Sequence, residues 1–237
     1  MIPIADESPK GFIPFVNYVF IALNILVFFF LQPSGMEAAS QFYKTYGLIP
    51  RQLITEPSNL DGYMRIFTSM FLHGGLGHLF GNMLYLWIFG DNIEYVLGHK
   101  FYILFYFMVG IGAALLQIST NPQSTIPMVG ASGAISGILG AYLLKFPKNR
   151  VTILFFIFFI IRIIRVPALI VLSLWFLMQI FRGYFTVADG GAGGGVAWFA
   201  HIGGFLSGFL LIKIFEYFAP PKRKKAIRRN TDSFFNL

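Results

Sequence analysis

The sequence contains no cysteine and few charged residues. Without cysteine the chain can form no disulfide, thiolate metal site, iron–sulfur cluster or cysteine nucleophile. Only 12% of the 237 residues are charged, whereas a soluble domain carries roughly 25%. So few charges cannot cover a water-facing surface, and 56% of the residues are hydrophobic. The composition therefore indicates a membrane protein and argues against a soluble enzyme, a disordered chain or a coiled coil.

The formal net charge of +8 comes mostly from six lysines and arginines between Lys222 and Arg229. A nucleic-acid groove would spread such charge over a folded surface, so we expect no nucleic-acid partner. A basic tail after an apolar segment is typical of chains anchored at the inner leaflet. We therefore expect residues 219–237 to form a basic cytoplasmic tail that is disordered at its end.

The gaps between charges define candidate membrane spans, because a spanning helix needs about 20 mostly apolar residues. The sequence predicts six of them, over 16–31, 66–90, 101–118, 131–145, 166–182 and 197–218. We expect the second to begin a turn or two after Arg65, and a break at Gly98–Lys100. The polar stretch 32–65 is too hydrophilic to span and too long for a turn, so it should have structure of its own.

The apolar run 151–165 is interrupted by Arg162 and Arg165. We expect this segment to lie in the membrane interface, because Pro167 favours a fresh helix start there. One long tilted helix whose arginines reach toward water is the alternative. The loop 183–196 is rich in glycine and should be flexible.

Lysine and arginine placement predicts the orientation. Lys145, Lys148 and Arg150 lie between the fourth and fifth spans and the basic tail follows the sixth, whereas the loop 119–130 carries no charge. The prediction is an all-α membrane protein, a bundle of six transmembrane helices with both termini cytoplasmic. The long loop between spans one and two would then be extracytoplasmic.

Polar side chains inside a bilayer are costly, so each suggests a function. His73, His78 and Asn82 lie near the start of the second span, Ser132 at the start of the fourth and His201 near the start of the sixth. These even-numbered spans all begin on the outer side in the predicted topology. Asn, Ser and His should therefore meet at similar depth on that side.

Small residues four apart let helix backbones approach closely in lipid. Two such pairs occur, Gly133 with Gly137 and Gly204 with Gly208. If these ridges pack together, Ser132 faces His201, and a hydroxyl next to an imidazole forms a nucleophile–base pair.

His78 and Asn82 are spaced i, i+4 and point the same way from one helix. Two neutral donors directed at one point can form an oxyanion hole. The backbone N–H of Ser132, at a helix N-terminus, can add a third donor.

Simpler interpretations stay open at this point. The glycines around Ser132 can serve packing alone, an intramembrane histidine can be structural or a proton relay, and His78 and Asn82 can form interhelical hydrogen bonds. His73, His78 and His201 could together supply three metal ligands. There is no His-Glu-x-x-His motif and no intramembrane carboxylate near these positions, so we expect neither metal nor cofactor.

The chain resembles the rhomboid family of intramembrane serine proteases. The matching stretches are Tyr63–Arg65, HGGLGHLFGNMLYLWIFGDNIE at 73–94, GASGAISGILG at 130–140 and AHIGGFLSG at 200–208. The six spans, the long first loop and the order Asn, Ser, His also match. The resemblance covers residues 14 to 218 and implies a rhomboid-like bundle, so we expect a single domain over 1–218. It also implies hydrolysis of a peptide bond in or beside a substrate's transmembrane helix.

The resemblance implies that Ser132 is the nucleophile and His201 the general base, a dyad without an aspartate. His78, Asn82 and the Ser132 amide would bind the oxyanion. Some family members stack an aromatic ring on the catalytic histidine from four residues after the serine. That position is Ser136 here, so His201 must be held another way.

Other family positions carry structural roles by resemblance. Arg65 matches an arginine of the first loop, although Met64 replaces the usual tryptophan before it. Glu94 matches an acidic position that helps tie the first loop. Segment 183–196 corresponds to a mobile loop that caps the site.

The predicted function is therefore intramembrane serine endopeptidase, acting on transmembrane protein substrates in the lipid bilayer. A non-catalytic rhomboid-like protein that binds membrane helices is the alternative, although such proteins usually lack the serine or histidine. A proton-coupled transporter would predict inverted repeats, which the sequence lacks. We expect a multi-pass protein of the plasma membrane of a prokaryote. The sequence does not predict an oligomeric state.

Overall fold

The computed structural model describes residues 2–9, 11–157, 160–188 and 196–219, and most of these are helical. The helices are α1 (Phe15–Leu26) with a π-helical continuation (Val27–Leu31), α2 (Met36–Tyr46), α3 (Pro50–Thr55), α4 (Leu60–Thr68) with a 3-10 turn (Ser69–Phe71), α5 (Leu76–Thr120), α6 (Ser132–Lys145), α7 (Ala168–Ala188) and α8 (Trp198–Phe218). Strands β1 (Ile2–Ala5), β2 (Arg150–Ile157) and β3 (Ile160–Pro167) form one antiparallel sheet in that order. The predicted basic tail, from residue 220 on, and the core of the predicted capping loop, 189–195, lie outside the described residues.

Three helices, α5, α7 and α8, are long and apolar enough to cross a membrane, and a shorter apolar helix covers Phe15–Leu31. Helix α5 is two helices joined at Gly98, whose φ of 73° is a left-handed conformation suited to glycine. This confirms the predicted break at Gly98. The expected start of the second span is wrong, because residues 60–71 form α4 and its 3-10 turn and α5 begins only at Leu76, after two glycines.

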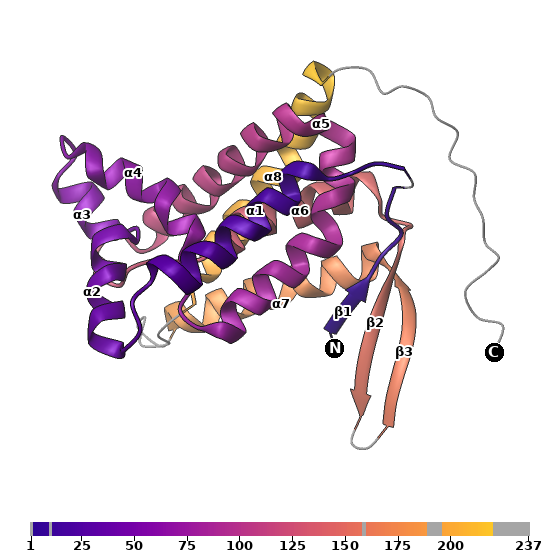
Figure 1. Ribbon diagram of the computed structural model, residues 1–237, viewed down its shortest axis with the longest axis horizontal. Coiled ribbons are helices and arrows are strands. Elements are labelled where there is room, and N and C mark those ends of the chain that lie inside the picture. The colour runs from indigo at the N-terminus through magenta and orange to yellow at the C-terminus, as the bar shows by residue number, and fades with distance from the viewer. Residues whose placement is uncertain (1, 10, 158–159, 189–195, 220–237) are drawn as a thin grey trace.

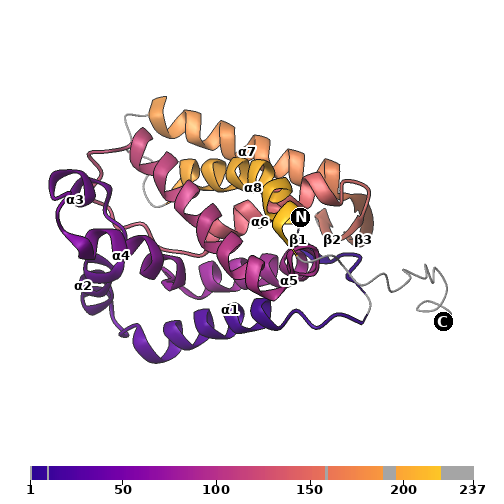
Figure 2. The same ribbon diagram turned by 90° about the horizontal axis from the view of Figure 1, so that it is seen from above.

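The polar stretch 32–65 has structure of its own, as predicted. Helices α2, α3 and α4 gather at one end of the molecule (Figure 1). The sheet and the first residues of α1 lie at the opposite end (Figure 2). Helices α6 and α8 follow the fourth and sixth predicted spans to within a residue, and α7 continues six residues past the predicted end at 182.

Helix α6 is the centre of the bundle, with every residue from Ala134 to Tyr142 buried. The two glycine ridges meet there, as the sequence predicts. A Cβ atom built on Gly204 would overlap the carbonyl oxygen of Gly133, and one on Gly208 would overlap that of Gly137. Backbones this close leave no room for a side chain, so α6 and α8 have a fixed register.

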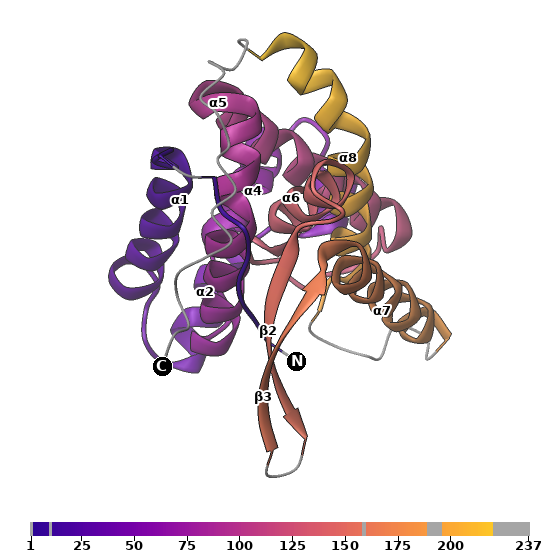
Figure 3. The same ribbon diagram turned by 90° about the vertical axis from the view of Figure 1, so that its right-hand side faces the viewer.

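The all-α prediction is wrong for two parts of the chain, because residues 2–5 form a strand and strands β2 and β3 form a β-hairpin rather than a helix. Its strands pair Val151 with Val166 and Ile153 with Ile164, and β1 adds to the edge of β2. The run is rich in valine, isoleucine and phenylalanine, which favour strands. The single tilted helix is therefore also wrong. The hairpin runs across the helix direction and extends beyond the bundle (Figures 1 and 3).

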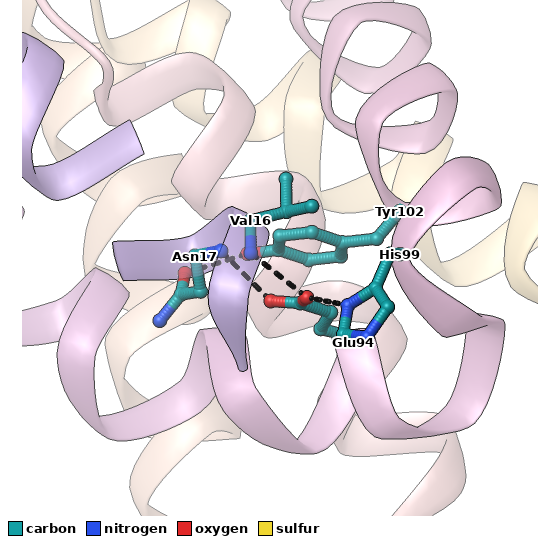
Figure 4. A network of polar contacts seen from close by, with 5 residues as sticks. All are labelled: Val16, Asn17, Glu94, His99 and Tyr102. Carbon is teal, nitrogen blue, oxygen red and sulfur yellow. Dashed lines mark hydrogen bonds and ion pairs between the residues drawn. The ribbon is translucent and has the colours of Figure 1, made fainter. Parts of the chain in front are cut away.

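Glu94 fixes the start of α1 (Figure 4). Its carboxylate accepts hydrogen bonds from the backbone N–H groups of Val16 at 3.0 Å and Asn17 at 2.7 Å, and it contacts His99. These free amides at a helix start would otherwise be buried without partners. The expectation that Glu94 ties the first loop is therefore corrected, since its partners are α1 and α5. Arg65 does act within that loop, where its guanidinium donates to the Gln52 side chain.

Candidate active site

Ser132 and His201 lie in hydrogen-bond contact at the end of the bundle near α2–α4. Ser132 is the first residue of α6, and His201 lies in the first turn of α8. Their Oγ and Nε2 atoms are 2.9 Å apart although the residues are 69 positions apart in sequence. The close approach of the Gly133 and Gly204 backbones sets this distance. A hydroxyl that donates to an imidazole nitrogen is the arrangement of a nucleophile and its base.

Gly130 shapes the turn before Ser132. Its φ of 128° strains any residue with a side chain, and its amide donates to the carbonyl oxygen of Ser69 at 2.9 Å. A Cβ atom at Gly130 would lie 2.8 Å from His78 Nε2 and 3.5 Å from Ser132 Oγ. Glycine therefore leaves open the space that these two side chains share.

The tautomer of His78 follows from its hydrogen bond. The backbone N–H of Gly74 donates to His78 Nδ1 at 3.3 Å, so in the neutral ring Nε2 carries the proton. That N–H is directed toward the space beside Gly130. Asn82 lies one turn further along the same face of α5 and is 7% exposed. Its Nδ2 has no hydrogen-bond partner within the described residues. Both side chains thus hold a donor available to a ligand.

His73 lies outside α5, in the short segment before it, and its side chain is buried. Gln32 holds its backbone, since His73 N donates to Oε1 at 2.8 Å and Nε2 donates to the His73 carbonyl at 2.9 Å. Its ring is 5.2 Å from that of His78, centroid to centroid. The described part of the chain holds no group of three or more metal-ligating side chains, so the three histidines do not form the ligand set considered above.

The second ring nitrogen of His201 contacts Gln179, a residue to which the sequence motifs assign no role. His201 Nδ1 lies 2.9 Å from Gln179 Oε1, and Gln179 Nε2 donates to the Trp175 carbonyl at 3.1 Å. Gln179 is 5% exposed and belongs to α7. The signal was present, because an amide in the middle of an apolar span is costly and should have a function.

Ser136 occupies the position from which some family members stack an aromatic ring on the catalytic histidine, and its hydroxyl bonds to the helix backbone instead. Ser136 Oγ donates to the backbone carbonyl of Ser132 at 2.6 Å. Two tryptophans lie near the His201 ring, Trp175 at 6.1 Å and Trp198 at 5.9 Å between centroids, the latter edge-on. The start of α8 is held by the Gln117 side chain, which accepts from the Ala200 amide at 3.1 Å.

A cavity of about 40 Å³ opens beside Ser132. Its walls are mostly apolar and small, and they include Met70, Ala113, Met128, Gly130 and Ala200. A space of this size holds a water molecule or a small side chain.

The family model for the Rhomboid domain matches residues 61–218, two thirds of the sequence, a range that includes His78, Asn82, Ser132, Gln179 and His201. The chain therefore belongs to the rhomboid family. It is 35% identical to Rhomboid protease GluP of Bacillus subtilis over 137 residues, which are 58% of this chain and 26% of that protein. It is 31% identical to RHOMBOID-like protein 5 of Arabidopsis thaliana over 165 residues, 70% of this chain and 47% of the relative.

A third relative is Rhomboid protein 1, mitochondrial, of Saccharomyces cerevisiae, 29% identical over 145 residues that are 60% of this chain and 39% of that protein. The chain thus matches less than half of the length of each of these relatives. Relatives occur in bacteria, plants and mitochondria. The family includes intramembrane proteases. This chain has helices long and apolar enough to cross a membrane, and a Ser–His pair in hydrogen-bond contact.

Proposed function

We propose that this protein is an intramembrane serine endopeptidase in which Ser132 is the nucleophile and His201 the general base. The observation that supports this most directly is the 2.9 Å contact between Ser132 Oγ and His201 Nε2. Because Nε2 accepts the hydroxyl proton, the serine oxygen can attack a peptide carbonyl carbon as the proton passes to the imidazole.

The attack produces a tetrahedral intermediate with a negative oxygen. Three donors can stabilise it, namely the Ser132 backbone N–H, His78 Nε2–H and the unpartnered Asn82 amide. When the C–N bond breaks, His201 returns its proton to the leaving amine and an acyl ester remains on Ser132. Water then attacks the ester with His201 again as base, and a carboxylate is released.

The substrates we propose are transmembrane segments of other proteins. The backbone of such a helix is internally hydrogen-bonded, so it must unwind locally before a serine can reach a carbonyl. Helix-breaking or small residues near the scissile bond should therefore favour cleavage. The small apolar cavity next to Ser132 supports a small side chain at that position.

We further propose the membrane arrangement that the charge pattern predicts. The two halves of α5 would cross separately, and with α1, α6, α7 and α8 this makes six crossings with both termini in the cytoplasm. The Ser132 site would then lie near the outer side, below α2–α4 and accessible to water. A single domain over 1–218 and a plasma-membrane location in a prokaryote are part of the same proposal.

The experiment that tests the activity is labelling of the detergent-purified protein with a fluorophosphonate probe. We expect the parent chain to be labelled and both Ser132→Ala and His201→Ala to lose labelling. Labelling should also fall at acid pH, because a protonated imidazole cannot accept the serine proton. A labelled Ser132→Ala variant would show that another residue is the nucleophile. A folded, monodisperse parent without labelling would favour the alternative, a non-catalytic protein that binds membrane helices.

A further inference from the structure

Resting on the proposed function, we infer that Gln179 is a positioning residue that completes a Ser132–His201–Gln179 triad. The contacts form a chain with one consistent set of protons. Gln179 Oε1 can only accept, so its 2.9 Å contact places the proton of the neutral His201 ring on Nδ1, and Nε2 then accepts from the Ser132 hydroxyl. The amide holds the ring in the tautomer and rotation that direct the Nε2 lone pair at the serine.

The amide itself is held in one orientation. Gln179 Nε2 donates to the Trp175 carbonyl, so the oxygen and not the nitrogen faces His201. Trp175 lies one turn earlier on α7 and also places its ring near the imidazole. At 5% exposure the glutamine has few other partners, and its rotation would leave a buried donor and a buried acceptor unpaired. Helix α7 thus supplies the support that the missing aromatic at Ser136 would otherwise give.

A neutral amide in this role has a specific chemical consequence. An aspartate in the third position of a triad stabilises the imidazolium that forms during the reaction, whereas an amide orients the ring without adding charge. The base should therefore protonate less readily, and activity should persist to lower pH, than with a carboxylate at position 179.

Three variants test this, with the rate of fluorophosphonate labelling followed as a function of pH. Gln179→Met keeps the volume but removes the acceptor, and we expect labelling to slow about tenfold to a hundredfold, well short of the loss expected for a charged orienting residue. Gln179→Glu keeps an acceptor oxygen and adds a negative charge, so its labelling rate should exceed that of Gln179→Met. Its acid limb should also move to higher pH by about one unit or more, because a carboxylate favours the imidazolium. Met178→Leu, at the neighbouring exposed position, is the matched control and should leave both the rate and the profile unchanged.

The outcomes separate this inference from the proposed function. A parent chain that is labelled at Ser132, together with a Gln179→Met variant that labels at the parent rate, would overturn the role of Gln179 alone. An acid limb that does not move in a folded Gln179→Glu variant would do the same, because a purely structural residue would not shift the profile. A parent without labelling would overturn the proposed function itself.

The hairpin supports a second, independent inference. We infer that the β2–β3 hairpin lies on the surface of an anionic phospholipid bilayer at the end of the bundle opposite α2–α4. The hairpin projects sideways from the bundle, across the direction of the helices (Figures 1 and 3). A segment with this direction runs along a membrane surface when the helices cross it.

The side chains of β3 fit such a surface. Ile161 and Ile163 are 65% and 64% exposed, and Ile164 on the other face of the strand is exposed as well. Most antiparallel sheets that face water have one polar face, and this strand has apolar residues on both. Its apolar surface continues into exposed Leu169 and Ile170 at the start of α7, a candidate membrane span.

The charge of the hairpin identifies the lipid. Arg150, Arg162 and Arg165 are its charged residues, and residues 146–167 include no acid. Arg162 and Arg165 are exposed and form no salt bridge with any residue that the structure describes. Basic side chains near a bilayer are attracted by the negative charge of an anionic surface. The surrounding isoleucines would enter the interface while the arginines bind phosphate groups.

The absence of native cysteine makes a labelling test direct. A nitroxide on Ile163→Cys would report contact with lipid by its accessibility to oxygen and to a water-soluble nickel chelate. Leu210→Cys, on an exposed apolar face of α8, serves as the lipid reference, and Ser58→Cys, between α3 and α4, serves as the water reference.

In phosphatidylcholine vesicles with about 30 mol% phosphatidylglycerol we expect Ile163 to resemble the lipid reference. In the double variant Arg162→Gln, Arg165→Gln the accessibility of the label at position 163 should shift toward the water reference. The same shift is expected for the parent arginines in vesicles of pure phosphatidylcholine. Accessibility equal to that of Ser58 in both lipids would overturn the inference. If protection of the label at position 163 from the nickel chelate depended on protein concentration, the inference would also be overturned. A second copy of the chain would then cover this surface.

Discussion

Glu94 and Asn82 are both buried polar residues in the first half of α5, about three turns apart, and they differ in how their polar atoms are used. The Glu94 carboxylate receives two backbone amides and contacts His99. The Asn82 amide nitrogen has no partner within the described residues. Buried polar atoms are nearly always hydrogen-bonded, so an unpaired one requires an explanation. At one end of this segment the polar group stabilises the fold. At the other end, under the proposed function, the Asn82 donor stays available to the oxyanion.

The change with the largest expected effect should lower stability and activity together. Gly208 packs against the Gly137 carbonyl at a distance that excludes a methyl group. Gly208→Leu must separate α6 from α8, and overpacking of this kind costs about 1–3 kcal/mol or more. We expect a lower unfolding temperature in detergent and loss of fluorophosphonate labelling, because the Ser132–His201 contact spans the same two helices.

The control for this prediction is Leu210→Ala, two residues further on α8, where the side chain is exposed. That variant should keep both the unfolding temperature and the labelling rate. If Gly208→Leu retained both properties, the close packing of α6 and α8 would not determine the geometry of the site.

Asn82→Leu should separate catalysis from stability. Loss of one oxyanion donor lowers kcat by about a hundredfold to a thousandfold. The unfolding temperature should stay the same or rise, because an unpaired buried amide is replaced by an apolar side chain of similar size. Cleavage of a transmembrane substrate and thermal unfolding, measured on the same preparation, check the two parts. Normal cleavage would show that the Asn82 donor is not used in the reaction.

Glu94→Gln should have the opposite result. The new amide presents a donor to the backbone N–H groups of α1 and leaves a buried donor without an acceptor, which costs about 1–3 kcal/mol of stability. We expect a lower unfolding temperature, with kcat per folded molecule unchanged. Active-site titration with the fluorophosphonate probe gives the folded, active fraction. A large fall in kcat for the titrated sites would mean that the start of α1 is coupled to Ser132.

The sequence identified much of the site and less of what supports it. The glycine pairs placed α6 against α8, and Ser132 and His201 therefore lie where the helix faces predicted. The hairpin was missed because both faces of β3 are apolar, and a short apolar run without alternation does not distinguish a strand from a helix. Gln179 and Glu94 depend on partners 22 and 78 positions away, which only the packed structure brings together. Both residues are nevertheless polar positions in apolar segments, and that feature is visible in the sequence.

The smallest expected effect concerns Asp6, which joins the N-terminal segment to the end of the bundle that holds Glu94. Its carboxylate oxygen accepts from Asn92 at 2.8 Å and from the Tyr142 hydroxyl. Burial, with the nearby Asp91 and Glu7, raises the pKa of Asp6 from 3.8 to about 7. The folded state therefore binds a proton more tightly than the unfolded state. The stabilisation that protonated Asp6 provides is fully present below the unfolded pKa of 3.8. It is lost as pH rises to about 7, and at higher pH the stability no longer changes because of Asp6.

Asp6→Asn keeps a neutral side chain in place, so it should remove this part of the pH dependence. Hydrogen exchange of the β1 amides checks the prediction locally. After correction for the intrinsic pH dependence of exchange, the exchange rate should increase from acid to neutral pH in the parent. It should not increase in the variant. Asp61→Asn, exposed in α4, is the control. An equal pH dependence in parent and Asp6→Asn would assign it to another group. If labelling at Ser132 changed together with β1 exchange, the two ends of the molecule would be coupled, and the separation between a structural and a catalytic region would not hold.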